Sequence, residues 1–242
     1  MDRLSLFSIL YIVLSYVAAA VFFGGLAFKL WGYAVTPSPL KIPTTPQPVT
    51  KISLLMKNLT DVATFSSLFN GNRWTWIGGY VFHIILLFIL IRHLRFFVEP
   101  VSPILKTLQP FGMYAGLLLP IPLIYLFVRR LTVDRIAYIS SWADMFALIL
   151  FFLIGLTGIG LNVLAHPDLV AVKQFLLGLI LFSPINIPSH LMFLFHFTLV
   201  LILAFYFPFS KLLHAGGLFF SPAKTQLDNM RDVRHVNPWA KE

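Results

Sequence analysis

HFTLVLILAFYFPFSKLLH, residues 196–214, is an almost wholly apolar stretch with a histidine at each end. Its length and composition predict a membrane-spanning helix. An imidazole is costly to bury in hydrocarbon without a partner, so two of them in one span require an explanation. At about 100° per residue, eighteen residues complete five turns, which would place His196 and His214 on one helix face about 27 Å apart.

The rest of the chain has a similar composition. Of its 242 residues, 58% are hydrophobic and only 11% are charged, whereas about 25% of the residues in a soluble domain are charged. Several runs exceed the roughly 18 apolar residues that suggest a membrane span. The sequence therefore predicts an all-α integral membrane bundle of five transmembrane helices in the cell (inner) membrane. The predicted spans are Leu6–Phe28, Trp76–Phe97, Phe111–Val128, Tyr138–Leu161 and Ile187–Leu213.

Two apolar segments need separate treatment. Leu6–Phe28 is too long for the core of a signal peptide, and no convincing cleavage site follows it, so we expect it to remain as a span. Leu169–Phe182 carries Lys173 and Gln174, lies between two prolines and is short for a crossing. An interfacial or re-entrant helix is expected there.

Lys and Arg are unevenly distributed between the loops. If the N-terminus is outside, the inside segments 29–75, 129–137 and 214–242 with Lys211 hold five, three and five of the 18 Lys and Arg residues. Cytoplasmic loops of membrane proteins carry an excess of Lys and Arg, so we expect the N-terminus outside and the C-terminus in the cytoplasm. The net charge of +9 then reflects topology and anionic headgroups, not nucleic-acid binding.

Two polar regions are predicted to face the cytoplasm. The loop 29–75 contains five prolines from Pro37 to Pro48, which block regular helix and sheet. This part is either a disordered linker or an extended strap against a partner, and the rest of the loop has the periodicity of a short interfacial helix. The tail 218–242 is polar and could dock on another subunit, so the chain divides into a membrane domain, 1–217, and this tail.

A second histidine pair lies in the second span. His83 and His93 are ten residues apart, or about 15 Å along a helix. The second and fifth spans run antiparallel in this topology, so we expect His93 level with His196 near the outer face and His83 level with His214 near the inner face. Two histidines that face each other can supply both axial ligands of a haem iron, and two such levels predict two haem b groups. Helix tilt and the break at Pro208 would absorb the roughly 12 Å difference in spacing.

Each histidine taken alone is better explained as an ordinary polar residue at a helix end, and only the paired arrangement favours haem. Ligation removes most of the cost of burying an imidazole, because Nε2 binds the metal and Nδ1 needs only one acceptor. Of the three other histidines, His166 and His235 are expected to be solvated. His190, at the outer start of the fifth span, is ambiguous.

Small and basic residues flank the histidines. Gly78 and Gly79 precede His83 and would let a flat macrocycle approach the backbone. Four basic residues stand near helix ends, where haem propionates would project: Arg73, Arg92, Arg95 and Lys211. Any one of them could equally extend its charge to the lipid headgroups, but a pair of arginines around His93 on the outer side is less easily explained in that way.

The chain contains no cysteine. This excludes disulfides, thiolate nucleophiles, cysteine-bound iron–sulfur clusters and covalently attached haem c in this chain. Any metal is then held by histidine or oxygen ligands, and further iron–sulfur carriers must belong to a partner.

These motifs resemble a known family. The stretch 196–214, with FPFS ahead of its second histidine, resembles the last helix of respiratory nitrate reductase gamma subunits, and FHIILLFILIRH, residues 82–93, matches the other ligand helix of that family. The likeness covers residues 6–217. Four further motifs look like the branch called DsrM, the cytochrome b of the sulfite-reduction-associated complex DsrMKJOP: YAVTPSPLKIPTTPQPVT (33–50), RWTW (73–76), IRHLRFF (91–97) and RHVNPW (234–239).

The resemblance implies a function. The chain would be an electron-transfer subunit that exchanges electrons between a menaquinone-type quinone and a cytoplasmic iron–sulfur subunit, DsrK-like, in dissimilatory sulfur metabolism. DsrK resembles the catalytic subunit of heterodisulfide reductase. Other membrane and extracytoplasmic subunits would complete the complex, and the lipid bilayer would surround the chain. Haem ligation carries over to the matching positions His83, His93, His196 and His214.

The quinone pocket of this family lies beside the outer haem, which implies quinone or propionate contacts from Arg92, Arg95 and Glu99. Glu99 is a plausible acceptor for a quinol proton. It could also form a surface ion pair with Arg95, four residues before it, and this simpler explanation is slightly favoured.

Other functions remain open at this stage. The chain could be the gamma-type cytochrome b of another respiratory oxidoreductase, such as nitrate reductase or heterodisulfide reductase, or an assembly subunit without a cofactor. A transporter that relays protons between histidines without haem predicts acidic residues or broken helices near the midplane. Pro120 and Pro122 interrupt the third span, but the only carboxylate within a span is Asp144, near the inner end of the fourth.

Overall fold

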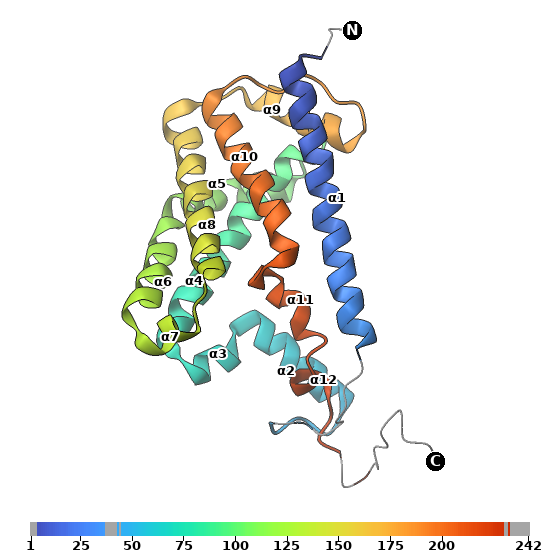
Figure 1. Ribbon diagram of the computed structural model, residues 1–242, viewed down its shortest axis with the longest axis vertical. Helices are drawn as coiled ribbons and strands as arrows, with labels where there is room; N and C mark the ends of the chain where they lie inside the picture. Colours follow the sequence, from blue (N-terminus) through green and yellow to red (C-terminus); the bar gives the residue numbers. More distant parts are fainter. Residues whose placement is uncertain (1–3, 37–42, 44, 230–231, 233–242) are drawn as a thin grey trace.

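The computed structural model describes residues 4–36, 43, 45–229 and 232 (Figure 1). These residues form helices and connecting loops, with no β-strand among them. The α-helices are α1 (Leu6–Val35), α2 (Lys51–Thr64), α3 (Ser66–Gly71), α4 (Arg73–His93), α5 (Pro103–Leu118), α6 (Pro120–Thr132), α7 (Asp134–Ile139), α8 (Trp142–Gly160), α9 (Leu169–Ile180), α10 (Leu191–Tyr206), α11 (His214–Leu218) and α12 (Pro222–Thr225). The shorter turns are the 3₁₀ segments η1 (Leu94–Phe96), η3 (Phe207–Phe209) and η4 (Lys211–Leu213) and the π-helical segment η2 (Leu161–Ala165).

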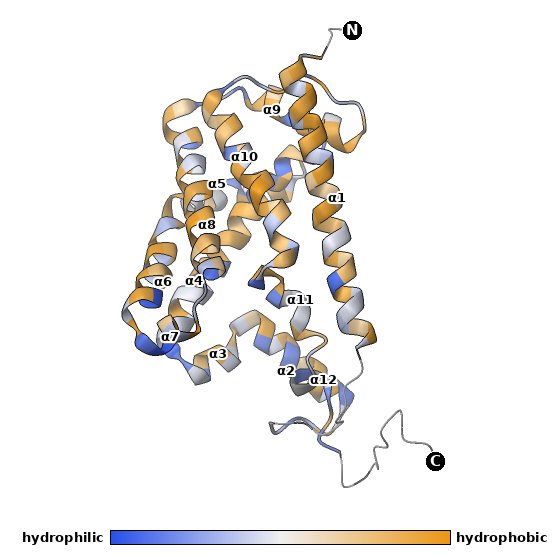
Figure 2. Ribbon diagram, in the orientation of Figure 1, coloured by the Kyte–Doolittle hydropathy of each residue, from blue (hydrophilic) through white to orange (hydrophobic). Residues whose placement is uncertain are grey.

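Five helical segments in the described part of the chain are long and apolar enough to cross a membrane, which confirms the expected number of spans. They are Leu6–Val35, Arg73–Phe96, Pro103–Thr132, Trp142–Ala165 and Leu191–Phe209. Figure 2 shows apolar residues along most of their length, with hydrophilic residues concentrated where α2, α7 and α12 lie. The chain is therefore an all-α, multi-pass membrane protein.

The bundle has two ends that differ in structure. At one end, here called the α9 end, α1 begins and α9 lies beside the loop that leads to α10 (Figure 1). At the other, the α2 end, α2, α3 and α12 lie below the spans. Pro37 and Pro39 of the proline-rich segment lie outside the described residues, and so does the motif RHVNPW with His235.

Prolines shape the third span without ending it. α5 and α6 follow one another along a single span, Pro103–Thr132, that is longer than the predicted Phe111–Val128. Each of the two helices starts with a proline, a position where the missing N–H costs little because it would have no partner within the helix. The prediction stopped at the polar residues that precede Phe111, yet an exposed helix end readily includes them.

The fourth span begins later than the predicted Tyr138–Leu161, because a cap divides this segment. α7 ends at Ile139 and α8 begins at Trp142. The Ser141 side chain accepts a hydrogen bond from the Asp144 backbone N–H, and the Asp144 carboxylate accepts one from the Ser141 N–H. This capping box satisfies N–H groups that a helix start leaves free. Asp144 therefore caps the span at the α2 end.

The fifth span is shorter than the predicted Ile187–Leu213. α10 stops at Tyr206 and passes into two 3₁₀ turns, because Pro208 has no N–H for the helical ladder. His214 then starts a separate helix, α11. The expectation that His196 and His214 lie on one continuous helix face is therefore wrong. The break instead places His214 independently of the helical repeat that carries His196.

α9 is a short helix that buries one face at its end of the bundle. Phe175, near its middle, is fully buried, and Asp168 caps its first turn. Phe175 and Val172 pack in one cluster with residues of α1, α10 and the loop before α10: Ile12, Ile187, Phe193 and Leu194. The helix thus packs against α1 and against the start of α10.

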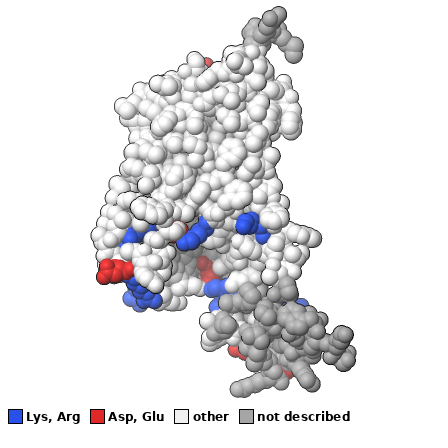
Figure 3. Space-filling model, in the orientation of Figure 1, with Lys and Arg blue, Asp and Glu red and all other residues white. Residues whose placement is uncertain are grey.

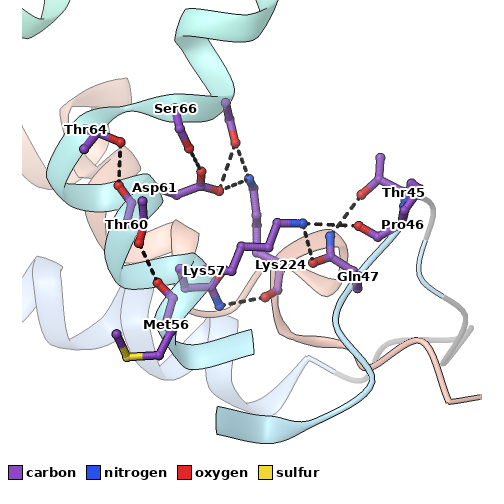
Figure 4. A network of polar contacts seen from close by, with 12 residues as sticks. Thr45, Pro46, Gln47, Met56, Lys57, Thr60, Asp61, Thr64, Ser66 and Lys224 are labelled. Carbon is purple, nitrogen blue, oxygen red and sulfur yellow. Dashed lines mark hydrogen bonds and ion pairs between the residues drawn. The ribbon is translucent and has the colours of Figure 1, made fainter. Parts of the chain in front are cut away.

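A platform closes the α2 end of the bundle. It consists of α2, α3 and the described tail from α12 to Asn229, and Figure 4 shows the polar contacts that hold it together. The Asp61 carboxylate accepts hydrogen bonds from Lys224 Nζ at 2.7 Å, from Ser67 Oγ at 2.9 Å and from Ser66. Asn58 Nδ2 donates to the Lys224 carbonyl oxygen. The tail therefore packs on the protein's own loop.

Charge and hydrogen bonds set the ionisation of Asp61. Burial by itself raises the pKa of this carboxyl, but the hydrogen bonds from Lys224, Ser66 and Ser67 outweigh burial and hold the pKa at about 2. The carboxylate is charged at neutral pH, and its ion pair with Lys224 fastens α12 to α2.

Candidate functional site

One histidine pair lies toward the α2 end. His83 is in α4, and His214 is the first residue of α11. Their ring centroids are 5.9 Å apart, and the ring planes are nearly perpendicular, at 89°. Phe65, in the left-handed turn between α2 and α3, contacts the His83 ring edge-on with centroids 4.9 Å apart. The platform therefore reaches this pair directly.

A second pair lies toward the α9 end. His93 is the last residue of α4, and His196 is in α10. Their ring centroids are 6.5 Å apart, and the planes are nearly parallel, at 17°. The structure thus brings the four histidines together in the two pairs that antiparallel spans imply.

Hydrogen bonds fix which ring nitrogen carries the proton in three of the four histidines. The Nδ1 atoms of His83, His93 and His214 lie 2.6, 2.7 and 2.9 Å from the carbonyl oxygens of Gly79, Ile89 and Lys211. A carbonyl oxygen can only accept, so each Nδ1 carries the hydrogen and donates it. The lone pair of each ring is therefore on Nε2, the nitrogen that a metal would use.

Thr157 fixes the fourth histidine in the same way. Its Oγ1 lies 2.8 Å from His196 Nδ1 and also within hydrogen-bond distance of the Leu153 and Ile154 carbonyl oxygens. The single hydroxyl hydrogen is directed to those carbonyls, so Oγ1 accepts from His196 Nδ1–H. Within the described residues, Nε2 of all four histidines forms no hydrogen bond.

The spacing within each pair suits a shared metal ion. An imidazole nitrogen binds a metal at about 2 Å, so two imidazoles on opposite sides of one ion have centroids about 6 Å apart. No group of three or more His, Asp or Glu side chains that could hold a metal lies among the described residues. Two imidazole donors in each pair would suit a haem, whose macrocycle would supply the remaining ligands, better than a bare metal ion.

An ion pair holds the turn that carries His214. Lys211 Nζ lies 2.8 Å from Asp144 Oδ2, and Arg130 Nη1 lies 3.9 Å from the same oxygen. The carbonyl of Lys211 is the acceptor for His214 Nδ1. Asp144 in α8 thereby fixes η4 and, through it, the His214 ring. Lys211 was expected near a propionate, and the structure places its ammonium on Asp144.

The residues expected at the quinone or propionate site have partners within the protein. Arg92 Nη2 donates to Asn162 Oδ1 at 3.0 Å, and Arg95 Nη1 donates to Gln109 Oε1 at 2.7 Å. Glu99 forms an ion pair with Lys173 of α9. The alternative of a Glu99 pair with Arg95 is therefore wrong, because Lys173 takes that carboxylate.

The two glycines before His83 have different surroundings. A Cβ on Gly78 would lie 2.6 Å from Tyr125 Cδ1, so this glycine permits close packing of α4 on α6. A Cβ on Gly79 would meet only Leu68 Cδ2, at 3.7 Å. Only Gly79 leaves space beside the histidine, and its carbonyl is the acceptor for His83. Arg73, the last of the basic candidates, lies over the Phe69 ring.

Sequence reasoning missed Thr157, although a signal was present. It is the only hydroxyl-bearing residue between Trp142 and Leu161, and a lone threonine in an apolar span usually has a hydrogen-bonding role. The ion pair between Lys211 and Asp144 was missed as well, because the break after Tyr206 changes which residues face each other.

Comparison with known proteins agrees with this arrangement. Residues 49–228 match the family model of the nitrate reductase gamma subunit. The chain belongs to this family. The matched segment contains α2 to α12 and all four paired histidines.

Two relatives are similar over nearly the whole chain. The Hdr-like menaquinol oxidoreductase cytochrome b-like subunit of Archaeoglobus fulgidus is 33% identical over 273 residues, which cover 94% of this chain and 82% of that protein. The protein of the same name in Archaeoglobus profundus is 31% identical over 279 residues, covering 95% of this chain and 82% of that one.

Proposed function

We propose that this chain is the cytochrome b subunit of a menaquinol oxidoreductase. It would bind two haem b groups, one between His83 and His214 and one between His93 and His196. The observation that carries the proposal is the geometry of these pairs: the ring centroids lie 5.9 and 6.5 Å apart, and each Nδ1 has a hydrogen-bond partner, which leaves Nε2 for a metal ion. The names of the Archaeoglobus relatives support the same class of protein.

The residues of the chain and the cofactor would have separate tasks. Haem at each level would supply one-electron transfer, for which no side chain here is suited. The histidines would hold the iron, and the acceptors of their Nδ1–H groups would fix the ring orientations. Apolar side chains of α4, α8 and α10 would keep water away.

Arg92 and Arg95 would hold carboxylates at the α9 end. Both guanidinium groups donate to neutral amides, and neither has a carboxylate partner among the described residues. A haem propionate beside either one would gain a charged hydrogen bond. Glu99, by contrast, already has a cationic partner in Lys173, so its part in accepting a quinol proton would require that ion pair to open.

We place the α2 end in the cytoplasm. Figure 3 shows Lys and Arg side chains gathered near that end on the visible face, in agreement with the charge bias of the loops. A cytoplasmic iron–sulfur subunit, DsrK-like, would dock there, where the contact between Phe65 and His83 connects the platform to the α2-end pair. The loop and tail motifs that look like DsrM favour a role in dissimilatory sulfur metabolism.

The direct test is an optical difference spectrum, dithionite-reduced minus oxidised, of membranes that contain the protein. We expect a b-type spectrum and two haems per chain. His83→Ala should remove one haem and His196→Ala the other, with His166→Ala as a matched control that keeps both. A protein that binds no haem, or variants that each retain two, would contradict the assignment.

The ring angles provide a second test, by electron paramagnetic resonance of the oxidised protein. Nearly parallel axial imidazoles separate the energies of the two iron π orbitals, whereas perpendicular ones leave them almost equal and widen the spread of g values. The pair at 89° should therefore give the larger highest g value and the pair at 17° the smaller one. Two identical signals would argue against these orientations.

A further inference from the structure

The helices α2 and α3 form a hairpin, residues 51–71, whose tip lies against α4. α2 rises toward the spans and α3 returns to the start of α4 (Figure 1). At the tip, Trp76 Nε1 donates to the Thr64 carbonyl oxygen at 2.8 Å. The Phe65 ring contacts the rings of Tyr80 and His83, with centroids 5.6 and 4.9 Å apart. The tip is therefore level with the part of α4 between Trp76 and His83.

This part of α4 belongs to the hydrocarbon layer of the membrane. The span Arg73–Phe96 has 24 residues, or about 36 Å of helix, and the hydrocarbon core of a bilayer is about 30 Å thick. A centred span would therefore extend about 3 Å beyond that core at each end. Tyr80 and His83 are about 10 and 15 Å along the helix from Arg73, so the tip of the hairpin reaches the depth of the acyl chains.

One face of α2 is occupied by other parts of the chain. The residues on this face are buried or half-buried: Leu54, Lys57, Asn58 and Asp61. Their polar side chains form hydrogen bonds with the segment 46–47, with the tail and with the tip of the hairpin. These contacts fix the rotation of α2 about its own axis.

The opposite face of α2 is an exposed apolar stripe. Its members follow the helical repeat and are 77, 57, 57, 48 and 42% exposed: Ile52, Leu55, Met56, Leu59 and Val62. None of these side chains is charged or polar. Removing such a surface from water is favourable, and the bonds on the other face prevent α2 from turning the stripe inward. The stripe therefore requires an apolar partner outside the described chain.

The polar groups near the tip are suited to a lipid environment, because they are bonded within the hairpin. Four hydroxyl groups donate either to carbonyl oxygens of α2 or to the Asp61 carboxylate, those of Thr60, Thr64, Ser66 and Ser67. Asp61 is also paired with Lys224, and the Phe65 N–H donates to the Asp61 carbonyl oxygen at 2.9 Å. In hydrocarbon, polar groups must find their partners inside the protein.

We propose that the α2–α3 hairpin is re-entrant and that its apolar stripe lies against the acyl chains of the bilayer. The stripe continues the lipid-facing surface of the spans at the α2 end. Two tryptophans mark the membrane interface there, Trp31 near the end of α1 and Trp74 near the start of α4, and they are 69% and 66% exposed. The hairpin thus enters the membrane from the α2 end and shields His83 with Phe65.

Two other occupants fit the stripe less well. The haem proposed beside His83 would reach only the end of the stripe nearest the tip, because Ile52 and Val62 are about 15 Å apart along α2. A soluble protein would cover residues outside the membrane and could not reach the half of α2 that leads to Phe65.

The experiment uses the absence of cysteine from this chain. Leu55→Cys and Leu59→Cys each introduce one thiol, which is labelled with a fluorescent maleimide before the whole chain is placed in phosphatidylcholine vesicles. We expect both labels to be quenched strongly by lipids with brominated acyl chains. Aqueous iodide should quench them several-fold less than it quenches a label at a water-exposed position.

Two further positions calibrate the quenching. Leu87→Cys is the lipid control, because Leu87 lies near the middle of α4 and is 50% exposed. Asp228→Cys is the water control, in the exposed part of the tail. Each labelled variant should keep the thermal unfolding temperature of the unaltered protein, which shows that the fold is retained.

The pattern of quenching decides between the occupants. Labels at Leu55 and Leu59 that respond as at Leu87 support the proposal. A response as at Asp228, with no effect of the brominated lipids, would show that the stripe is open to water and available to a soluble protein, and would overturn the proposal. Weak quenching by both reagents would show that the protein or its haem covers the stripe, with the same consequence.

Discussion

The two histidine pairs share helix α4 but are held in different ways. At the α9 end, His196 depends on a side chain of a neighbouring helix, since Thr157 of α8 accepts its Nδ1–H. At the α2 end, His83 and His214 both donate to carbonyls three or four residues before them. The orientation of His196 is therefore open to a single substitution, whereas that of the other three histidines follows from the course of the backbone.

The difference extends to what surrounds each pair. The α2-end pair is supported by the Asp144–Lys211 ion pair and by Phe65 of the platform, whereas the α9-end pair lies beside α8, where a Cβ on Gly158 would lie 3.4 Å from His196 Cε1. One level is thus connected to a polar assembly and the other to a neighbouring span.

The largest effect is expected from a substitution that pushes α4 away from α6, because α4 carries one histidine of each pair. Gly78→Leu would place atoms within 3 Å of Tyr125 and Leu126, and overpacking of this kind costs about 1–3 kcal/mol. We expect a lower thermal unfolding temperature in detergent and loss of haem first from the α2-end pair. Gly79→Ala, the adjacent change with only Leu68 nearby, is the matched control. Equal stability of the two variants would contradict the packing role of Gly78.

A smaller effect should appear at the α9 end alone. Thr157→Val removes the acceptor for His196 Nδ1–H. This change would make the imidazole a weaker donor to the iron of the haem proposed at the α9 end and would raise the midpoint potential of that haem. Each tenfold change in a one-electron equilibrium corresponds to about 59 mV, and loss of one buried hydrogen bond should shift the potential by tens of millivolts. A redox titration checks this. Thr157→Ser keeps the hydroxyl and should keep the potential.

A substitution near the α2-end pair should cause a smaller shift in midpoint potential. Asp144→Asn leaves Lys211 without its anion, and the extra positive charge should raise the potential of the α2-end haem. Lys211 is 71% exposed, and exposed ion pairs contribute only about 0–1 kcal/mol, so we expect a shift below about 40 mV. Glu99→Gln breaks an ion pair at the α9 end and should leave the α2-end potential unaltered. If Asp144→Asn shifts the midpoint potentials of both proposed haems, the effect of the Asp144–Lys211 ion pair is not confined to the α2 end.

The smallest effect concerns the platform and its response to pH. The pKa of Asp61 is about 2 in the folded protein, below its ordinary value of 3.8. The stabilisation from its ionised form is therefore complete above about pH 4 and is lost as the pH falls toward 2. The protection factor of the tail amides near Lys224, which is the intrinsic exchange rate divided by the measured rate at the same pH, should be lower at pH 3 than at pH 5. Asp61→Asn should show a low protection factor at both pH values, and Asp228→Asn should behave as the unaltered protein.

The sequence was sufficient for the parts of the fold that depend on hydrophobic length. A span needs enough apolar residues to cross the bilayer, and all five could be counted. The antiparallel order of α4 and α10 followed from that count, which is why the levels of the four histidines could be anticipated.

Features that depend on single hydrogen bonds were harder to anticipate. The break after Tyr206 follows from Pro208, but how far it displaces His214 depends on packing against α1. The partners of Arg92, Arg95 and Glu99 come from residues distant in sequence, Asn162, Gln109 and Lys173. Composition gives no information about such pairings.

Helix α1 touches the chain on both sides of His214. A Cβ on Gly25 would lie 2.7 Å from Pro208 Cβ, and a Cβ on Gly216 would lie 2.7 Å from Leu30 Cδ2. Each of these contacts joins residues more than 180 positions apart in the sequence. Contacts between such distant segments carry a loop-closure cost that neighbouring helices do not pay. The position of His214 is therefore set by long-range packing, and we expect the α2-end pair to form late in folding.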